Sequence, residues 1–103
     1  MMRSDLRVRV VRVTGSCPLY SVGQAFHIRR GYVLDPGDSP ICMHGLTSLM
    51  PYYVALSRGV PPDDLGLAGP EQGRAYVQCL DPCDLTGGGT VTFEIEPVHA
   101  TAK

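Results

Sequence analysis

Four cysteines and one histidine are the residues of this chain best suited to carry out chemistry. The cysteines are Cys17, Cys42, Cys79 and Cys83, and His44 follows Cys42 by two positions. Thiolates bind zinc and iron, and they also act as nucleophiles. Isolated cysteines more often pack in a core. All four, however, fall near expected ends of helices or strands, where distant segments can meet, and this favours a shared metal or thiol site.

The rest of the chain favours reduced thiols. Residues 1–6 contain no apolar segment of the signal-peptide type, and Arg, Gly, His or Pro interrupts every apolar run well before it could span a membrane. We therefore expect a cytoplasmic protein without a membrane partner. In that compartment a disulfide framework is a poorer explanation of four cysteines than a metal or thiol site.

Composition indicates a single globular domain, residues 1–103. Hydrophobic residues make up 44% and charged residues 18%, with a formal net charge of −1. Such a balance argues against a nucleic-acid partner and leaves a small molecule or another protein. Basic residues are almost all arginine, a bias typical of GC-rich bacterial coding. The motifs GxxxxGK[ST], GxSxG and HExxH do not occur, which removes several common enzyme classes.

The expected elements predict an α+β fold. Residues 6–13 alternate apolar and arginine side chains, as in a half-buried strand, and further strands are expected at 25–30, 75–80 and 90–96, with 32–34 as a continuation of the second. We predict a small antiparallel sheet of about four strands with one kinked helix packed on one face. Residues 81–89 are expected to form a long hairpin loop, and residues 98–103, with His99, a frayed tail.

Residues 42–58 contain the one convincing helical pattern. Apolar side chains recur there at steps of three and four residues, and Gly59 follows as a natural stop. Pro51 interrupts the pattern, because it lacks a backbone donor and crowds the carbonyl of Thr47. We therefore predict a kink, or a break into two pieces near Ser48. Residues 61–65 are expected to form a short helical turn that proline begins.

Three sequence blocks resemble a known family. The blocks GSCPLYSVGQAF, ICMHGLTSLMPYYVALSRGVPPDDLGLA, and YVQCLDP followed by GGGTVTFEIEP are similar to consecutive blocks of a small prokaryotic protein family of unknown function. The likeness extends from Gly15 to Pro97. It implies that Cys17, Cys42 and Cys79 recur in the family, whereas relatives commonly have another residue in place of Cys83. The resemblance favours a three-cysteine site and implies no activity.

The main prediction is a metal site formed by Cys17, Cys42 and Cys79, whose side chains we expect to be adjacent. The ion would be zinc, or alternatively iron or an iron–sulfur cluster. The fourth ligand would be His44, Cys83 or water. A protein ligand would close the site and make it structural, whereas water would leave it open for Lewis-acid catalysis. On a regular helix, residues two apart diverge, so Cys42 and His44 can converge only if Cys42 precedes the helix.

The alternative prediction is a small tailoring enzyme that acts on a hydrophobic metabolite. Cys42 would be its nucleophile, with His44 or His27 as the base, or an open metal site would act as the Lewis acid. Three tyrosines could line an apolar ligand pocket beside the thiols, although aromatic residues near a kinked helix more often belong to the core: Tyr20, Tyr52 and Tyr53.

Overall fold

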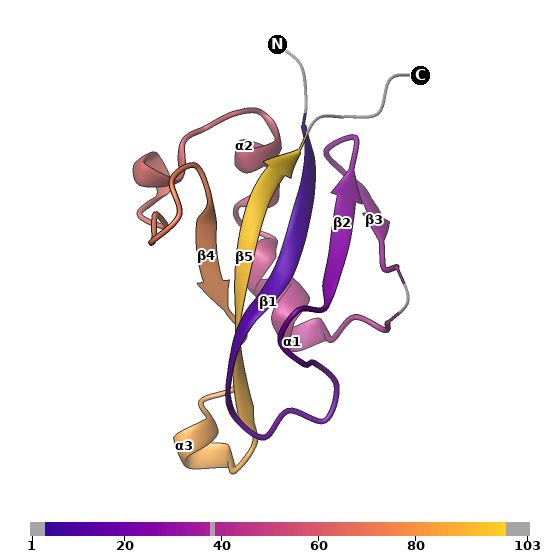
Figure 1. The fold of residues 1–103 in the computed structure, drawn as a ribbon, viewed down its shortest axis with the longest axis vertical. Coiled ribbons are helices and arrows are strands. Elements are labelled where there is room, and N and C mark those ends of the chain that lie inside the picture. Colours follow the sequence, from indigo (N-terminus) through magenta and orange to yellow (C-terminus); the bar gives the residue numbers. More distant parts are fainter. Residues whose placement is uncertain (1–3, 38, 99–103) are drawn as a thin grey trace.

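A five-stranded antiparallel sheet forms the framework of the protein. The computed structural model describes residues 4–37 and 39–98. The strands lie in the order β3-β2-β1-β5-β4, so the first and last strands of the chain pair at the centre (Figure 1). Their bounds are β1 Asp5–Gly15, β2 Ala25–Arg29, β3 Val33–Asp35, β4 Ala75–Gln78 and β5 Gly89–Val98. The α+β class and the antiparallel sheet agree with the sequence prediction.

The helices are short, and α1 and α2 lie on one side of the sheet (Figure 1). Helix α1 covers Met43–Leu49, α2 covers Tyr53–Ser57, and a 3₁₀-helix, η1, covers Pro62–Leu65. Helix α3, Cys83–Thr86, lies at the end of the molecule opposite α2. Within the described part of the chain, none of these helices has the length and apolar character needed to cross a membrane.

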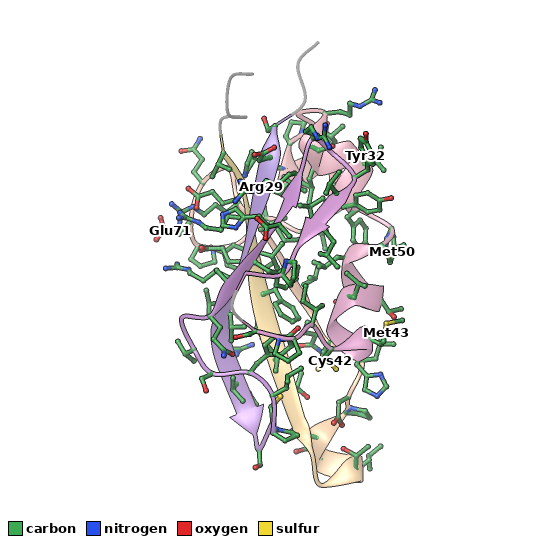
Figure 2. All side chains as sticks on the ribbon, turned by 90° about the vertical axis from the view of Figure 1, so that its right-hand side faces the viewer. Arg29, Tyr32, Cys42, Met43, Met50 and Glu71 are labelled. Atoms are coloured by element: carbon green, nitrogen blue, oxygen red, sulfur yellow. The ribbon has the colours of Figure 1, made fainter. Side chains whose placement is uncertain are left out.

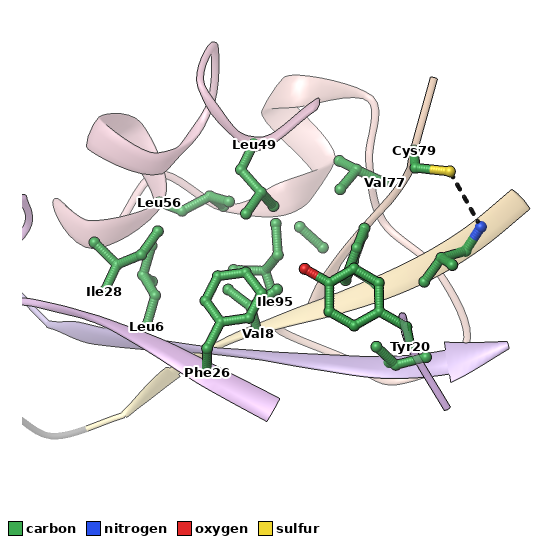
Figure 3. Close-up of a cluster of buried hydrophobic side chains, with 14 residues drawn as sticks. Leu6, Val8, Tyr20, Phe26, Ile28, Leu49, Leu56, Val77, Cys79 and Ile95 are labelled. Atoms are coloured by element: carbon green, nitrogen blue, oxygen red, sulfur yellow. Dashed lines mark hydrogen bonds between the residues drawn. The ribbon is translucent and has the colours of Figure 1, made fainter. Parts of the chain in front are cut away.

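Alternation along the strands separates an apolar face from a polar one. Leu6, Val8 and Val10 of β1 are buried under the helices, while the intervening Arg7 and Arg9 are exposed on the other face. The same period-two pattern holds on the neighbouring strands, because side chains of a strand point alternately to its two faces. The core consists of one cluster, which includes Phe26, Ile28, Leu49, Leu56, Val77, Phe93 and Ile95 (Figure 3).

The structure corrects the predicted number of strands. Residues 33–35 do not continue the second strand but fold back on it, with Ile28 opposite Leu34. The reversal occurs at Arg30 and Gly31, whose φ angles are 56° and 84°. The left-handed conformation at both residues turns the chain sharply, so a single expected strand becomes a hairpin.

Of the two outcomes predicted for Pro51, a kink or a break near Ser48, the structure shows the break. Instead of one helix over residues 42–58, α1 ends at Leu49 and α2 begins at Tyr53. The expected loop over residues 81–89 contains helix α3. Val98, expected in the frayed tail, pairs with Asp5 at the end of β5. The remaining tail residues, 99–103, which include His99, lie outside the described residues.

A glycine lets α1 approach the sheet closely. A Cβ atom on Gly45 would lie 2.7 Å from Cζ of Phe93, and the Phe93 side chain is completely buried. Two non-bonded carbon atoms cannot approach so closely in a packed interior. Any larger residue at position 45 would therefore push α1 away from β5.

We expect Gly45→Ala to lower the free energy of unfolding by about 1–3 kcal/mol, because the added methyl group overpacks the contact with Phe93. Equilibrium urea unfolding measures the change. Thr47→Ala, on the exposed side of the same helix, is the control and should change stability by less than about 0.5 kcal/mol. A Gly45→Ala protein as stable as the control would contradict the close approach.

The polar face of the sheet is organised around Glu94. Its side chain is only 5% exposed and accepts hydrogen bonds from Tyr76 at 2.7 Å, Arg9 at 2.9 Å and Arg74 at 3.1 Å. Burial alone would raise the pKa of Glu94. The hydrogen bonds from Tyr76 and Arg9, together with the charges of Arg74 and Arg9, outweigh it and hold the pKa below the usual value of 4.5.

Acid should therefore weaken the fold through Glu94. Because its folded-state pKa is depressed, its stabilisation is fully present above about pH 4.5 and is lost as the pH falls through the folded-state pKa. Glu94→Gln should lower the free energy of unfolding at pH 7 by about 1–3 kcal/mol. It should also flatten the loss of stability between pH 7 and pH 3, measured by urea unfolding. Glu71→Gln, at an exposed position, should keep the wild-type profile; an unchanged profile in Glu94→Gln would refute the assignment.

Candidate functional site

A cavity of about 200 Å³ lies at one end of the core, and three of the four cysteines line it. Its walls come from the loop after β1, the start of α1, and the segments where β4 ends and β5 begins. The lining residues are Cys17, Pro18, Leu19, Tyr20, Cys42, His44, Gly45, Cys79, Asp81, Gly89 and Val91. The fold thus brings Cys17, Cys42 and Cys79 together from three separate segments.

Two of the three sulfur atoms accept backbone hydrogen bonds. The N–H of Tyr20 donates to Sγ of Cys17 at 3.4 Å. The N–H of Val91 donates to Sγ of Cys79 at 3.3 Å, the bond dashed in Figure 3. The thiol of Cys79 in turn points toward the carbonyl of Gly89 at 3.7 Å. Backbone donors of this kind hold a sulfur in a defined direction and help to stabilise metal-bound thiolates.

Cys42 occupies the position immediately before α1. Its backbone is extended, with φ −81° and ψ 135°, and its carbonyl accepts the N–H of Leu46 at 2.9 Å. His44, the second residue of the helix, is exposed yet also lines the cavity. Because Cys42 precedes the helix, the divergence of residues two apart on a regular helix does not apply to this pair.

Tyr20 links the loop after β1, which carries Cys17, to the residue before α1 and to β5. Its hydroxyl oxygen accepts the N–H of Cys42 at 2.9 Å, and its ring meets Phe93 edge to face at 5.5 Å between centroids. Burial raises the pKa of Tyr20 above its usual value of 10.0. The hydrogen bond from Cys42 opposes this rise, while the nearby thiols of Cys42, Cys17 and Cys79 add to it. Tyr20 therefore lines the same largely apolar cavity as the three thiols, with its hydroxyl against the backbone of Cys42.

Other candidates from the sequence lie elsewhere. Cys83 begins α3 beside Gly15 and does not line the cavity. His27 lies on the polar face of β2, where burial and then the charge of Arg29 lower its pKa below 6.5. Tyr52 and Tyr53 line two other surface hollows. Of the three tyrosines that the sequence proposed for a ligand pocket, the structure brings only Tyr20 to the thiols.

Several cavity residues were not anticipated from the sequence. Asp81 lies two residues after Cys79, and its carboxylate accepts the hydroxyl of Thr86. The spacing Cys79-Leu80-Asp81 could have indicated Asp81, because a residue just beyond the end of a strand lies close to the last residues of that strand. The apolar wall residues Leu19 and Val91 carry no local signal for a cavity.

The sulfur atoms surround the cavity without forming a ready-made metal site. Among residues 4–37 and 39–98, no group of three or more His, Cys, Asp or Glu side chains is arranged so that it could hold a metal ion. All four cysteines are free thiols. Binding an ion would therefore require the side chains of Cys17, Cys42 and Cys79 to turn toward one another across the cavity.

Comparisons with protein-family models, curated proteins and solved structures found no match to the chain. The resemblance to a small prokaryotic family therefore stays a prediction, and the site has to be interpreted from its own geometry.

The bond from Cys42 N–H to the Tyr20 hydroxyl can be tested by removing one oxygen atom. We expect Tyr20→Phe to lower the free energy of unfolding by about 1 kcal/mol and to speed hydrogen exchange of the Cys42 amide, because that donor loses its partner. NMR-detected exchange measures the second effect. Tyr53→Phe, which removes a half-buried hydroxyl from α2, is the matched control. Equal Cys42 exchange in both variants would contradict the assigned bond.

Proposed function

We propose that this is a small cysteine-cluster protein that binds a metal ion, zinc or iron, through the thiolates of Cys17, Cys42 and Cys79. The observation that carries the proposal is that three thiols from separate segments line one small cavity. Grouped thiolates repel one another unless a positive charge lies between them, and a metal ion provides that charge most directly. An iron–sulfur cluster would use the same sulfur ligands.

The energies involved favour closure of the cluster on an ion. Structural zinc sites in small peptides bind with about 10–16 kcal/mol at neutral pH. Turning a cysteine side chain away from its preferred rotamer costs on the order of 1 kcal/mol. The energy needed to turn three cysteine side chains is much smaller than the free energy of metal binding, so the thiols around the cavity can become ligands.

His44 is the best placed of the candidate fourth ligands. It lines the cavity with the three thiols, whereas Cys83 lies outside the lining. Its exposed imidazole can swing without disturbing the core. Coordination by His44 would complete a closed, structural site. With His44 turned to solvent, the fourth position would be left to water or another small ligand.

A second candidate function is a small tailoring enzyme acting on a hydrophobic metabolite. The apolar wall of the cavity beside the thiols is the observation that favours it. Cys42 would be the nucleophile and His44 the base, since both line the same space. A metal ion with an open position would instead supply Lewis-acid chemistry.

The metal content of cysteine variants tests the main proposal. Protein purified anaerobically under reducing conditions should contain about one equivalent of zinc or iron by elemental analysis. Cys17→Ala, Cys42→Ala and Cys79→Ala should each lose that metal, because each removes one of three ligands. Cys83→Ala is the matched control and should retain it. His44→Ala should weaken binding only if the imidazole is the fourth ligand.

Circular dichroism must show that each variant is folded before its metal content is compared. Cys79 is the most buried of the three, so its variant can lose stability for packing reasons alone. A folded Cys42→Ala protein with full metal content would overturn the proposed ligand set. A metal-free wild-type protein with all thiols reduced would leave the enzyme with a Cys42 nucleophile as the surviving candidate.

A further inference from the structure

The cavity is much larger than a metal ion requires. At about 200 Å³ it exceeds an engineered apolar cavity of about 150 Å³ that binds benzene, and it is smaller than the roughly 300–1,000 Å³ typical of sites for drug-sized ligands. Its walls include Pro18, Leu19, Val91 and the backbone of Gly45. The dimensions therefore suit a compact organic molecule of about one ring.

The charges around the cavity select against anions. Within the described chain, no lysine or arginine side chain lines it, and the one formally charged group in the lining is Asp81. A carboxylate or phosphate placed there would meet no lysine or arginine to replace its lost hydration, and the carboxylate of Asp81 would repel it. A neutral molecule meets neither penalty.

The Tyr20 hydroxyl is a hydrogen-bond donor on this apolar wall. Its oxygen accepts the N–H of Cys42, and among residues 4–37 and 39–98 its O–H makes no hydrogen bond to another protein group. The ring is held by its edge-to-face contact with Phe93, so the hydroxyl keeps its place at the cavity wall. A buried donor in this situation is best satisfied by an oxygen atom of a ligand.

We propose that the cavity binds a compact, neutral, mainly apolar molecule with one oxygen acceptor, which receives the hydrogen bond of Tyr20. The apolar part of the ligand lies against Leu19 and Val91. This inference rests on the proposed function only in sharing its cavity. It requires no metal ion, so reduced, metal-free protein is the material for its test.

Three ring compounds of similar size separate the effect of ligand charge from the effect of an oxygen acceptor. Acetophenone is neutral with a carbonyl acceptor, ethylbenzene is neutral without one, and benzoate is an anion. Their affinities for chelator-treated, reduced protein can be measured by NMR titration of methyl groups. We expect acetophenone to bind at least about tenfold more tightly than benzoate and to shift the methyl signals of Leu19 and Val91.

Two variants identify the site and the donor. Tyr20→Phe should weaken acetophenone about tenfold and leave ethylbenzene within about twofold, because only the ketone loses a hydrogen bond. Leu19→Phe should reduce binding of both by filling a half-buried part of the wall. Leu46→Phe, in the separate groove lined by Ile28, Tyr32 and Leu49, is the control and should preserve binding.

Equal affinity for benzoate and acetophenone would overturn the inference, as would signal shifts confined to the groove around Leu46. If Tyr20→Phe weakened ketone and hydrocarbon alike, the assigned hydrogen bond would be refuted. The metal proposal is judged separately from elemental analysis. If the purified protein contains no metal but binds acetophenone, the ligand proposal stands and the metal proposal fails. If the purified protein contains metal but its chelator-treated form binds none of the three compounds, the metal proposal stands and the ligand proposal fails.

Discussion

The contact among Gly45, Phe93 and Tyr20 is the constraint on which the site depends. Gly45 allows α1 to approach the buried ring of Phe93, and the edge of the Tyr20 ring packs on the same phenylalanine. Tyr20 then holds the chain before α1 through the N–H of Cys42. One packing contact thus fixes the relative positions of two segments that carry cysteines, and β5 passes beneath them to form the wall next to Cys79.

The two faces of the sheet differ: one carries a network of charged side chains, and the other carries the core and the cavity. On the polar face, the buried carboxylate of Glu94 gathers Arg9, Arg74 and Tyr76, so no second layer of helices is needed to satisfy those groups. On the apolar face, short helices cover the core but leave one end open beside the thiols (Figure 2 shows Cys42 and Met43 along that side). The cavity lies at the N-terminal end of α1, where Cys42 immediately precedes the helix.

The proposed metal site and the proposed ligand site would make different demands on the same cavity. Closure of Cys17, Cys42 and Cys79 on an ion would draw their sulfur atoms inward, whereas a bound organic molecule would keep the walls apart. Tyr20 lines the cavity beside the three cysteines. If the fourth position of a bound metal is left open, a small neutral ligand beside the ion would reconcile the two. A closed site with His44 as ligand would leave less room for it.

Local sequence patterns were sufficient to predict most helices and strands, but not the tertiary contacts between them. Alternation in residues 6–13 and 90–96 defined the two central strands, and Pro51 defined the helix break, because these effects depend on neighbours along the chain. The hairpin at Arg30 and Gly31 was missed, since left-handed backbone at a non-glycine residue has no reliable local signal. The same limit applies to the site. Residue type singled out the four cysteines, and the resemblance to a family favoured Cys17, Cys42 and Cys79. Only the tertiary structure decided that these three and Tyr20 line one cavity and that Cys83 does not. Contacts between residues far apart in the sequence determine where these cavity residues lie, so their spacing along the chain does not predict it.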